Sequence, residues 1–187
     1  MLEGIVAALA ANPGPGLRAA DAVLEDIWTY ERAEGRRLLV PYDIDQPGPW
    51  PEATVQIDIV FDEALAVDPV EVALTPSGAR LRAAPPELQL AWKILWLTTD
   101  GFPQGKDLYD AVLLAEAVDV PWPLLAEVLR PERRADADAF TAEKILDLDV
   151  DWDNHLAGSP GTAGTQRDWL DRLAIALHRS ERATKPA

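Results

Sequence analysis

Hydrophobic and polar positions follow two different periods along this chain, and the change falls near residue 85. Before it, apolar residues alternate with polar ones in short runs, which predicts strands. Two of these runs flank a Pro-Ser-Gly turn and predict a β-hairpin. Segment 2–11 fits a short helix that ends at NPGPG, whereas segment 22–30 fits a helix or a strand equally well. The predicted strands are 36–42, 54–61, 70–74 and 79–83.

After residue 85 the apolar positions recur at the three- and four-residue spacing of helices. The predicted helices are 86–98, 105–118, 122–129, 139–148 and 165–179. Small and polar residues at 157–165 predict a flexible linker, and the end of the chain predicts a frayed tail. The pattern therefore indicates an α+β protein, with a small mixed or antiparallel sheet followed by a helical C-terminal half. We expect a sheet-containing part at 1–84, a helical part at 85–179 and a flexible tail at 180–187.

Composition narrows the class of protein. The 187 residues include 48% apolar residues, which fits a globular protein with a core. The net charge of −15, from 17 basic and 32 acidic residues, disfavours binding to duplex DNA. Cysteine is absent, and no apolar run reaches the length of about 18 residues that a membrane span needs. We therefore expect a cytoplasmic protein with no membrane contact.

The helix predicted at 86–98 is apolar on almost every side and carries one lysine, Lys93. A buried ammonium is costly unless it is paired or reaches solvent, so Lys93 predicts either a structural ion pair or a cation that awaits a phosphate. The next predicted helix begins with Lys106, Asp107 and Asp110. Asp107 and Asp110 share one face at i,i+3 spacing, where the helix dipole also favours anions. A short loop joins the two helices, so contact between Lys93 and these carboxylates is geometrically reasonable.

A second candidate is Asp58, in the strand TVQIDIVFDE. Alternation places Val55, Ile57 and Ile59 on the apolar face and Asp58 on the opposite face. A carboxylate there is either part of a solvated sheet face or a metal ligand or general base held on a rigid strand.

Four segments resemble the nucleotidyl transferase AbiEii/AbiGii toxin family, whose members are polymerase-β-like nucleotidyltransferases of bacterial abortive-infection and toxin–antitoxin systems. The resemblance covers roughly residues 22–130. It implies Mg²⁺-dependent transfer of a nucleoside monophosphate from a nucleoside triphosphate to an RNA end or a protein hydroxyl. An antitoxin protein is an implied partner. The segments are GRRLLVPYDI, VQIDIVFDE, LAWKILWL and PQGKDLYDAVLLAE.

The resemblance also implies roles for individual residues. Asp58 is similar to the third carboxylate of the family's metal-binding trio and is the candidate catalytic residue. Lys93 is similar to the lysine that contacts the triphosphate. Lys106, Asp107 and Asp110 match the helix that supports the nucleotide. Carboxylates suit Mg²⁺ because it prefers hard oxygen ligands, and a lysine neutralises charge on the leaving phosphates.

One part of the family pattern is missing. Members have a Gly-Gly or Gly-Ser helix start followed by Asp-x-Asp, and no such segment precedes Asp58. We therefore expect this chain to lack the N-terminal catalytic hairpin, with Asp43-Ile-Asp45 as a secondary candidate for the metal pair. Three functions stay open from the residues: a nucleotidyltransferase-like enzyme, a non-catalytic remnant that binds a nucleotide or a protein, and an acidic interaction module.

Overall fold

The computed structural model describes residues 2–12, 16–29, 33–43, 53–61, 64–75, 77–133 and 140–184. The chain forms two compact units, Met1–Ala64 (unit 1) and Leu65–Ala187 (unit 2). Unit 1 contains a three-stranded sheet, and unit 2 contains a two-stranded sheet and most of the helices. The predicted α+β class is therefore confirmed.

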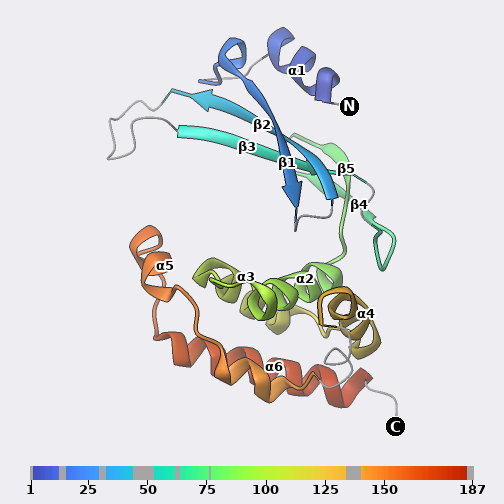
Figure 1. The fold of residues 1–187 in the computed structure, drawn as a ribbon, viewed down its shortest axis with the longest axis vertical. Helices are drawn as coiled ribbons and strands as arrows, with labels where there is room; N and C mark the ends of the chain where they lie inside the picture. The colour runs from blue at the N-terminus through green and yellow to red at the C-terminus, as the bar shows by residue number, and fades with distance from the viewer. Residues whose placement is uncertain are drawn as a thin grey trace. The chain divides into compact units, whose positions relative to one another are not determined.

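Unit 1 is an antiparallel meander with strand order β1-β2-β3 (Figure 1). The segment at 22–30, which fitted a helix or a strand, forms β1 because its backbone pairs along its whole length with β2. The predicted strands at 36–42 and 54–61 correspond to β2 and β3, which pair along eight residues of each strand. The elements are α1 (Leu2–Ala11), η1 (Ala19–Asp21), β1 (Val23–Thr29), β2 (Ala33–Tyr42) and β3 (Ala53–Val60).

The centre of this sheet is the best-covered part of unit 1. Leu38 and Val40 of β2 are 0% and 2% exposed, and they lie opposite Ile57 and Val55 of β3. Val55 is still 40% exposed, so the apolar face of β3 is only partly covered, although its alternation predicts a core face. Gly35 allows the strands to approach closely, since a Cβ atom there would lie 2.8 Å from the carbonyl oxygen of Ile59.

Unit 2 begins with a β-hairpin, as the turn signal predicts, and continues with helices. The predicted helices that begin at residues 86, 105, 122 and 165 are confirmed to within a few residues. Within the segment predicted as a helix at 139–148, residues 142–147 form a 3₁₀ helix. The elements are β4 (Val70–Leu74), β5 (Ala79–Ala83), α2 (Pro86–Thr99), α3 (Gly105–Ala117), α4 (Trp122–Arg133), η3 (Ala142–Asp147), α5 (Trp152–Gly158) and α6 (Gln166–Thr184).

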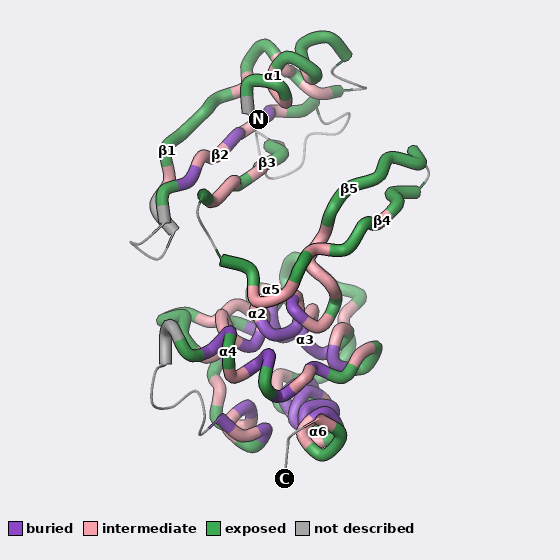
Figure 2. Tube along the Cα trace, turned by 90° about the vertical axis from the view of Figure 1, so that its right-hand side faces the viewer, coloured by how far each residue is buried: buried purple, intermediate pink, exposed green. Residues whose placement is uncertain are grey.

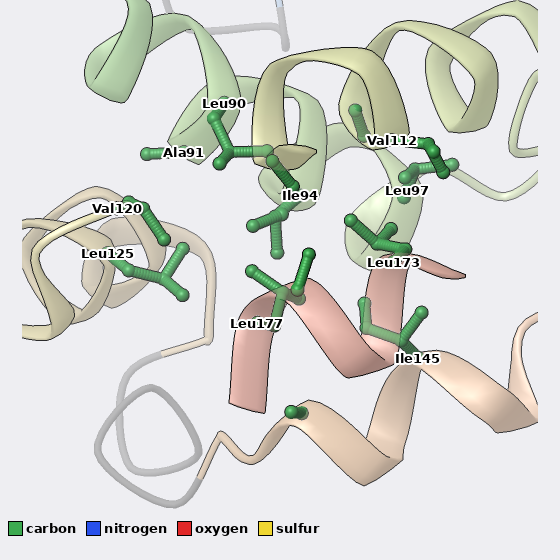
Figure 3. Packing of buried hydrophobic residues seen from close by; sticks show 14 of the residues in the cluster. Leu90, Ala91, Ile94, Leu97, Val112, Val120, Leu125, Ile145, Leu173 and Leu177 are labelled. Carbon is green, nitrogen blue, oxygen red and sulfur yellow. The ribbon is translucent and has the colours of Figure 1, made fainter. Parts of the chain in front are cut away.

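The helices of unit 2 enclose one hydrophobic core, and buried stretches of these helices are purple in Figure 2. Figure 3 shows Ile94 of α2 and Ile145 of η3 near Leu173 and Leu177 of α6. All four side chains are fully buried. At about 25 cal/mol per Å² of apolar surface removed from water, such side chains contribute most of the stability of a unit this size. None of the helices in the described residues combines the length and apolar character that a membrane span needs.

Described parts of two segments that the composition assigns to a linker and a tail are held in unit 2. The linker prediction at 157–165 is wrong because indole N–H groups hold the loop: Trp152 donates to the carbonyl of Gly164 at 3.3 Å and Trp169 to that of Ala163 at 2.9 Å. The predicted tail from residue 180 is helical as far as Thr184. Ser180 is fully buried, and its hydroxyl accepts the backbone N–H of Val120 at 3.2 Å.

Candidate functional site

Lys93 meets both predicted carboxylates in unit 2. Its Nζ lies 2.7 Å from Asp107 Oδ1 and 2.8 Å from Asp110 Oδ2, which joins α2 to the first two turns of α3. The side chains of Lys93 and Asp107 are 19% and 12% exposed, whereas that of Asp110 is 47% exposed. The cluster of Lys93, Asp107 and Asp110, called here the lysine site, is therefore closed at Asp107 and open to solvent at Asp110.

The electrostatics of the lysine site favour a charged ammonium. Burial by itself lowers the pKa of Lys93, but the hydrogen bonds to Asp107 and Asp110 outweigh it, so the pKa is raised. The Nζ atom also lies 5.1 Å from the centre of the Trp96 ring, a cation–π distance. One ammonium and two carboxylates leave the site with a net charge of −1. A free triphosphate is repelled by this charge unless a cation accompanies it.

The first turn of α3 is fixed by α5, a helix that the sequence did not predict. The backbone N–H of Asp151 donates to the carbonyl of Pro103 at 2.9 Å, just before α3. Gly105, the first residue of α3, is in close contact with α5, since a Cβ atom there would lie 2.6 Å from the carbonyl oxygen of Asp151 and 2.8 Å from the Cβ of His155. Only glycine fits here without displacement, so α5 determines where Asp107 and Asp110 stand.

Four aromatic rings, one of them from α3, form a second cluster in unit 2. Tyr109 contacts His155 and Trp169 with ring centroids 5.1 and 4.9 Å apart. Trp152 contacts the same two rings at 4.8 and 5.4 Å. Each ring thus touches two others, and this aromatic cluster connects α3, α5 and the start of α6.

Asp58, the predicted catalytic carboxylate, belongs to unit 1 and has partners there. Arg37 donates two hydrogen bonds to it at 2.8 and 3.0 Å, and the Gln56 amide donates a third at 2.8 Å. The hydrogen bonds from Arg37 lower the pKa of Asp58 most, and the bond from Gln56 lowers it further, so the carboxylate stays ionised. Both carboxylate oxygens already accept hydrogen bonds, and a metal ion has to compete with a bidentate guanidinium.

The remaining sequence candidates are Lys106, Asp43 and Asp45. Lys106 is exposed on α3, and among the described residues it makes no ion pair. Asp43 lies at the end of β2, where its carboxylate is 3.9 Å from Arg18 and its backbone N–H bonds to the carbonyl of Gly16. Asp45 lies outside the described residues. The roles of Asp43, Asp45 and Asp58 in metal binding therefore stay predictions.

Two features of these sites were not found from the sequence. The pairing of Arg37 with Asp58 depends on strand register, which sets these residues opposite each other across β2 and β3. The aromatic cluster gathers residues up to 60 positions apart in sequence, namely Tyr109, Trp152, His155 and Trp169. No local motif in the sequence indicates that these four residues meet.

Comparison with known families gives one match. The model of the family described as "AbiEii: Nucleotidyl transferase AbiEii toxin, Type IV TA system" matches residues 2–174. The match extends over both units and includes every sequence candidate named above. No curated protein and no solved structure matches the chain.

Proposed function

The chain belongs to the AbiEii nucleotidyl transferase toxin family, and from that premise we propose that unit 2 binds the phosphates of a nucleoside triphosphate at the lysine site. The observation that carries the proposal is the Lys93 ammonium, held 2.7 Å from Asp107 and 2.8 Å from Asp110. Such a cation, fixed before substrate arrives, stabilises charge that develops on a leaving pyrophosphate. The reaction is transfer of a nucleoside monophosphate to an RNA end or a protein hydroxyl.

The lysine site suits a magnesium ion that arrives with the triphosphate. Among the described residues no three His, Cys, Asp or Glu side chains gather closely enough to hold a metal ion alone. Mg²⁺ is commonly bound by one or two carboxylates plus the substrate's own phosphates, and the half-exposed Asp110 offers such a carboxylate. When bound, Mg²⁺ reverses the net charge at the site and polarises the phosphates.

Each side chain of the lysine site then has a distinct task. Asp107, which is nearly buried, keeps the Lys93 ammonium charged and oriented. Lys93 has three N–H donors and uses two of them on the carboxylates, which leaves one for a phosphate oxygen. Asp110 would hold the magnesium ion that arrives with the triphosphate. In this proposal Asp58 acts as a further catalytic carboxylate only after Arg37 releases it.

The biological setting of the proposal follows the family. We place the protein in the cytoplasm as the toxin of a toxin–antitoxin pair, with an antitoxin protein as partner. A non-catalytic remnant that still binds nucleotide is the second candidate, and one observation favours it: Asp58 is engaged by Arg37 and Gln56 and not presented to a metal ion.

Transfer of label separates the two candidates. The protein is incubated with Mg²⁺ and, in turn, ATP, GTP, CTP or UTP labelled at the α-phosphate, together with total RNA or with protein alone as acceptor. An enzyme transfers label from one of the four nucleotides, transfers none from the γ-labelled form, and loses activity in Lys93→Ala. A matched control is Lys144→Ala, which removes a lysine of η3 outside the lysine site. Binding without any transfer identifies the remnant.

A further inference from the structure

A cavity of about 460 Å³ opens beside α3, on the side that carries the aromatic cluster. Its walls include Tyr109 of α3, Ser159, Gly161 and Thr162 of the loop after α5, and Trp169 and Arg172 of α6. A volume of a few hundred cubic ångströms is the usual size of a small-ligand pocket. Nothing in the reaction described above uses this cavity.

The walls combine flat rings with a flat cation. The Tyr109 and Trp169 rings lie 4.9 Å apart, and the Arg172 guanidinium carbon lies 4.2 Å from the centre of the Trp169 ring. Glu116 holds Arg172 in place by accepting hydrogen bonds from Nε and Nη2 at 2.8 and 2.9 Å. These bonds leave Nη1 for another acceptor. The cavity therefore has stacking surfaces and a positioned donor in one place.

Polar groups in the cavity add hydrogen-bonding capacity. Within the described residues, the hydroxyls of Tyr109 and Ser159 make no hydrogen bond. Thr162 is already engaged, since its hydroxyl lies 3.4 Å from Nε2 of His155. A ligand that presents a flat apolar face and a polar edge matches this combination, and nucleobases have that chemistry.

The exposed surface of α3 connects the cavity to the lysine site. At 3.6 residues per turn, Lys106 lies about 60° from Tyr109 and about 40° from Asp110 around the helix axis. Lys106 is exposed and makes no ion pair among the described residues. Around the helix axis, a cation thus stands between Tyr109 of the cavity wall and the half-exposed carboxylate of the lysine site.

We propose that this cavity binds an unpaired nucleobase, with Lys106 contacting the phosphate attached to it. The net charge of −15 opposes a long duplex but not a single base held by rings and one guanidinium. The base belongs either to the nucleoside triphosphate or to the end of an RNA acceptor. The link to catalysis rests on the proposed function, whereas base binding itself does not.

A bulky side chain can be added to the lining of the cavity without damage to the fold. A side chain at Gly161 meets no atom within 4 Å of its Cβ position, so Gly161→Leu projects into open space. Gly4→Leu in α1 is a matched control, because its Cβ position is equally open. Tyr109→Leu removes a stacking ring, and the thermal midpoint of each variant checks that it is folded.

Nucleosides are the probe, because they carry a base and no phosphate. Saturation-transfer NMR with adenosine, cytidine, guanosine and uridine is expected to show contact of at least one base with the wild-type protein and with Gly4→Leu. The signal is lost in Gly161→Leu and Tyr109→Leu. Lys106→Ala weakens binding of the corresponding nucleoside monophosphate and leaves the nucleoside unchanged. Absence of any nucleoside signal, or a signal that persists in Gly161→Leu, overturns the proposal.

Two further titrations identify the source of the base. If it belongs to the triphosphate, Gly161→Leu weakens binding of the Mg²⁺–nucleotide complex by about ten-fold. If it belongs to an acceptor, Gly161→Leu weakens binding of a short single-stranded oligoribonucleotide by a similar factor and leaves nucleotide binding intact. A different outcome would refute only the proposed function of the lysine site. In that outcome Lys93→Ala retains full affinity for the Mg²⁺–nucleotide complex, while the nucleoside signals still depend on Gly161.

Discussion

Gly105 is the residue whose replacement tests most simply whether α5 positions the lysine site. A methyl group there would lie 2.6 Å from the carbonyl oxygen of Asp151, 2.8 Å from the Cβ of His155 and 3.1 Å from the Cα of Trp152. Two of these neighbours are backbone atoms, so a side-chain rotation cannot relieve the contact. Overpacking of this kind costs about 1–3 kcal/mol. Alanine recovers up to about 1 kcal/mol through its higher helix propensity.

We therefore expect Gly105→Ala to lower the free energy of unfolding by about 1–2 kcal/mol, and the thermal midpoint by about 3–8 °C. Far-ultraviolet circular dichroism follows the unfolding. Gly101→Ala, four residues earlier in the loop before α3, is the control because its Cβ position has no atom within 4 Å. Since the clash displaces the first turn of α3, the same variant also weakens nucleotide binding. Equal or greater stability of Gly105→Ala relative to Gly101→Ala would refute the close contact with α5.

Three other changes test the ion pairs and the buried hydroxyl. Lys93→Met lowers the free energy of unfolding by about 2–4 kcal/mol, because it leaves Asp107 nearly buried and unpaired. Adding Asp107→Leu restores most of that loss in urea titrations; a purely additive double variant contradicts the pairing. Hydrogen bonds from Arg37 lower the pKa of Asp58, so its contribution to stability is present above the unfolded pKa of about 3.9 and is lost as pH falls through the folded pKa. Asp58→Asn therefore flattens the acid limb of stability against pH, and an unchanged limb means that other carboxylates cause it. Ser180→Ala costs about 1–2 kcal/mol and speeds hydrogen exchange of the backbone N–H before α4; normal protection there rules out the hydroxyl contact.

The lysine site could be predicted from the sequence because its physical requirement is local. A single ammonium on an otherwise apolar helix needs a partner, and the short loop after α2 brings the first turn of α3 within reach. Lys93, Asp107 and Asp110 meet as this reasoning expects. The hairpin β4–β5 was predictable for a similar reason, since a turn signal between two short apolar runs fixes the register of its strands.

The partner of Asp58 could not be predicted, because about ten residues connect β2 to β3 and a connection that long does not fix strand register. A shift of one residue would have placed Arg37 on the opposite face. The helical structure at Ser180 was not predicted from the sequence for another reason. Composition alone marks its segment as polar and frayed, whereas the hydroxyls of Ser180 and Thr184 bond to backbone groups of Val120 and Trp122 at the start of α4.

The aromatic cluster shows the limit of reading short motifs. The loop at 157–165 is rich in glycine and small residues, which is typical of a linker. Its carbonyl oxygens nevertheless accept hydrogen bonds from the indole N–H groups of Trp152 and Trp169. These bonds join segments that periodicity treats as separate. The cavity beside Tyr109 arises only from that three-dimensional arrangement.

The central claim is that Lys93 contacts the phosphates of a magnesium-bound nucleotide, and isothermal titration of the protein with Mg²⁺ and ATP, GTP, CTP or UTP tests it most directly. The account predicts binding of at least one nucleotide to the wild-type protein and to Lys144→Ala. It predicts a loss of affinity of about ten- to hundred-fold in Lys93→Ala, the value of one hydrogen bond between charged groups, and no binding when Mg²⁺ is removed with a chelator. Equal affinity of Lys93→Ala and wild type for the same nucleotide would contradict it.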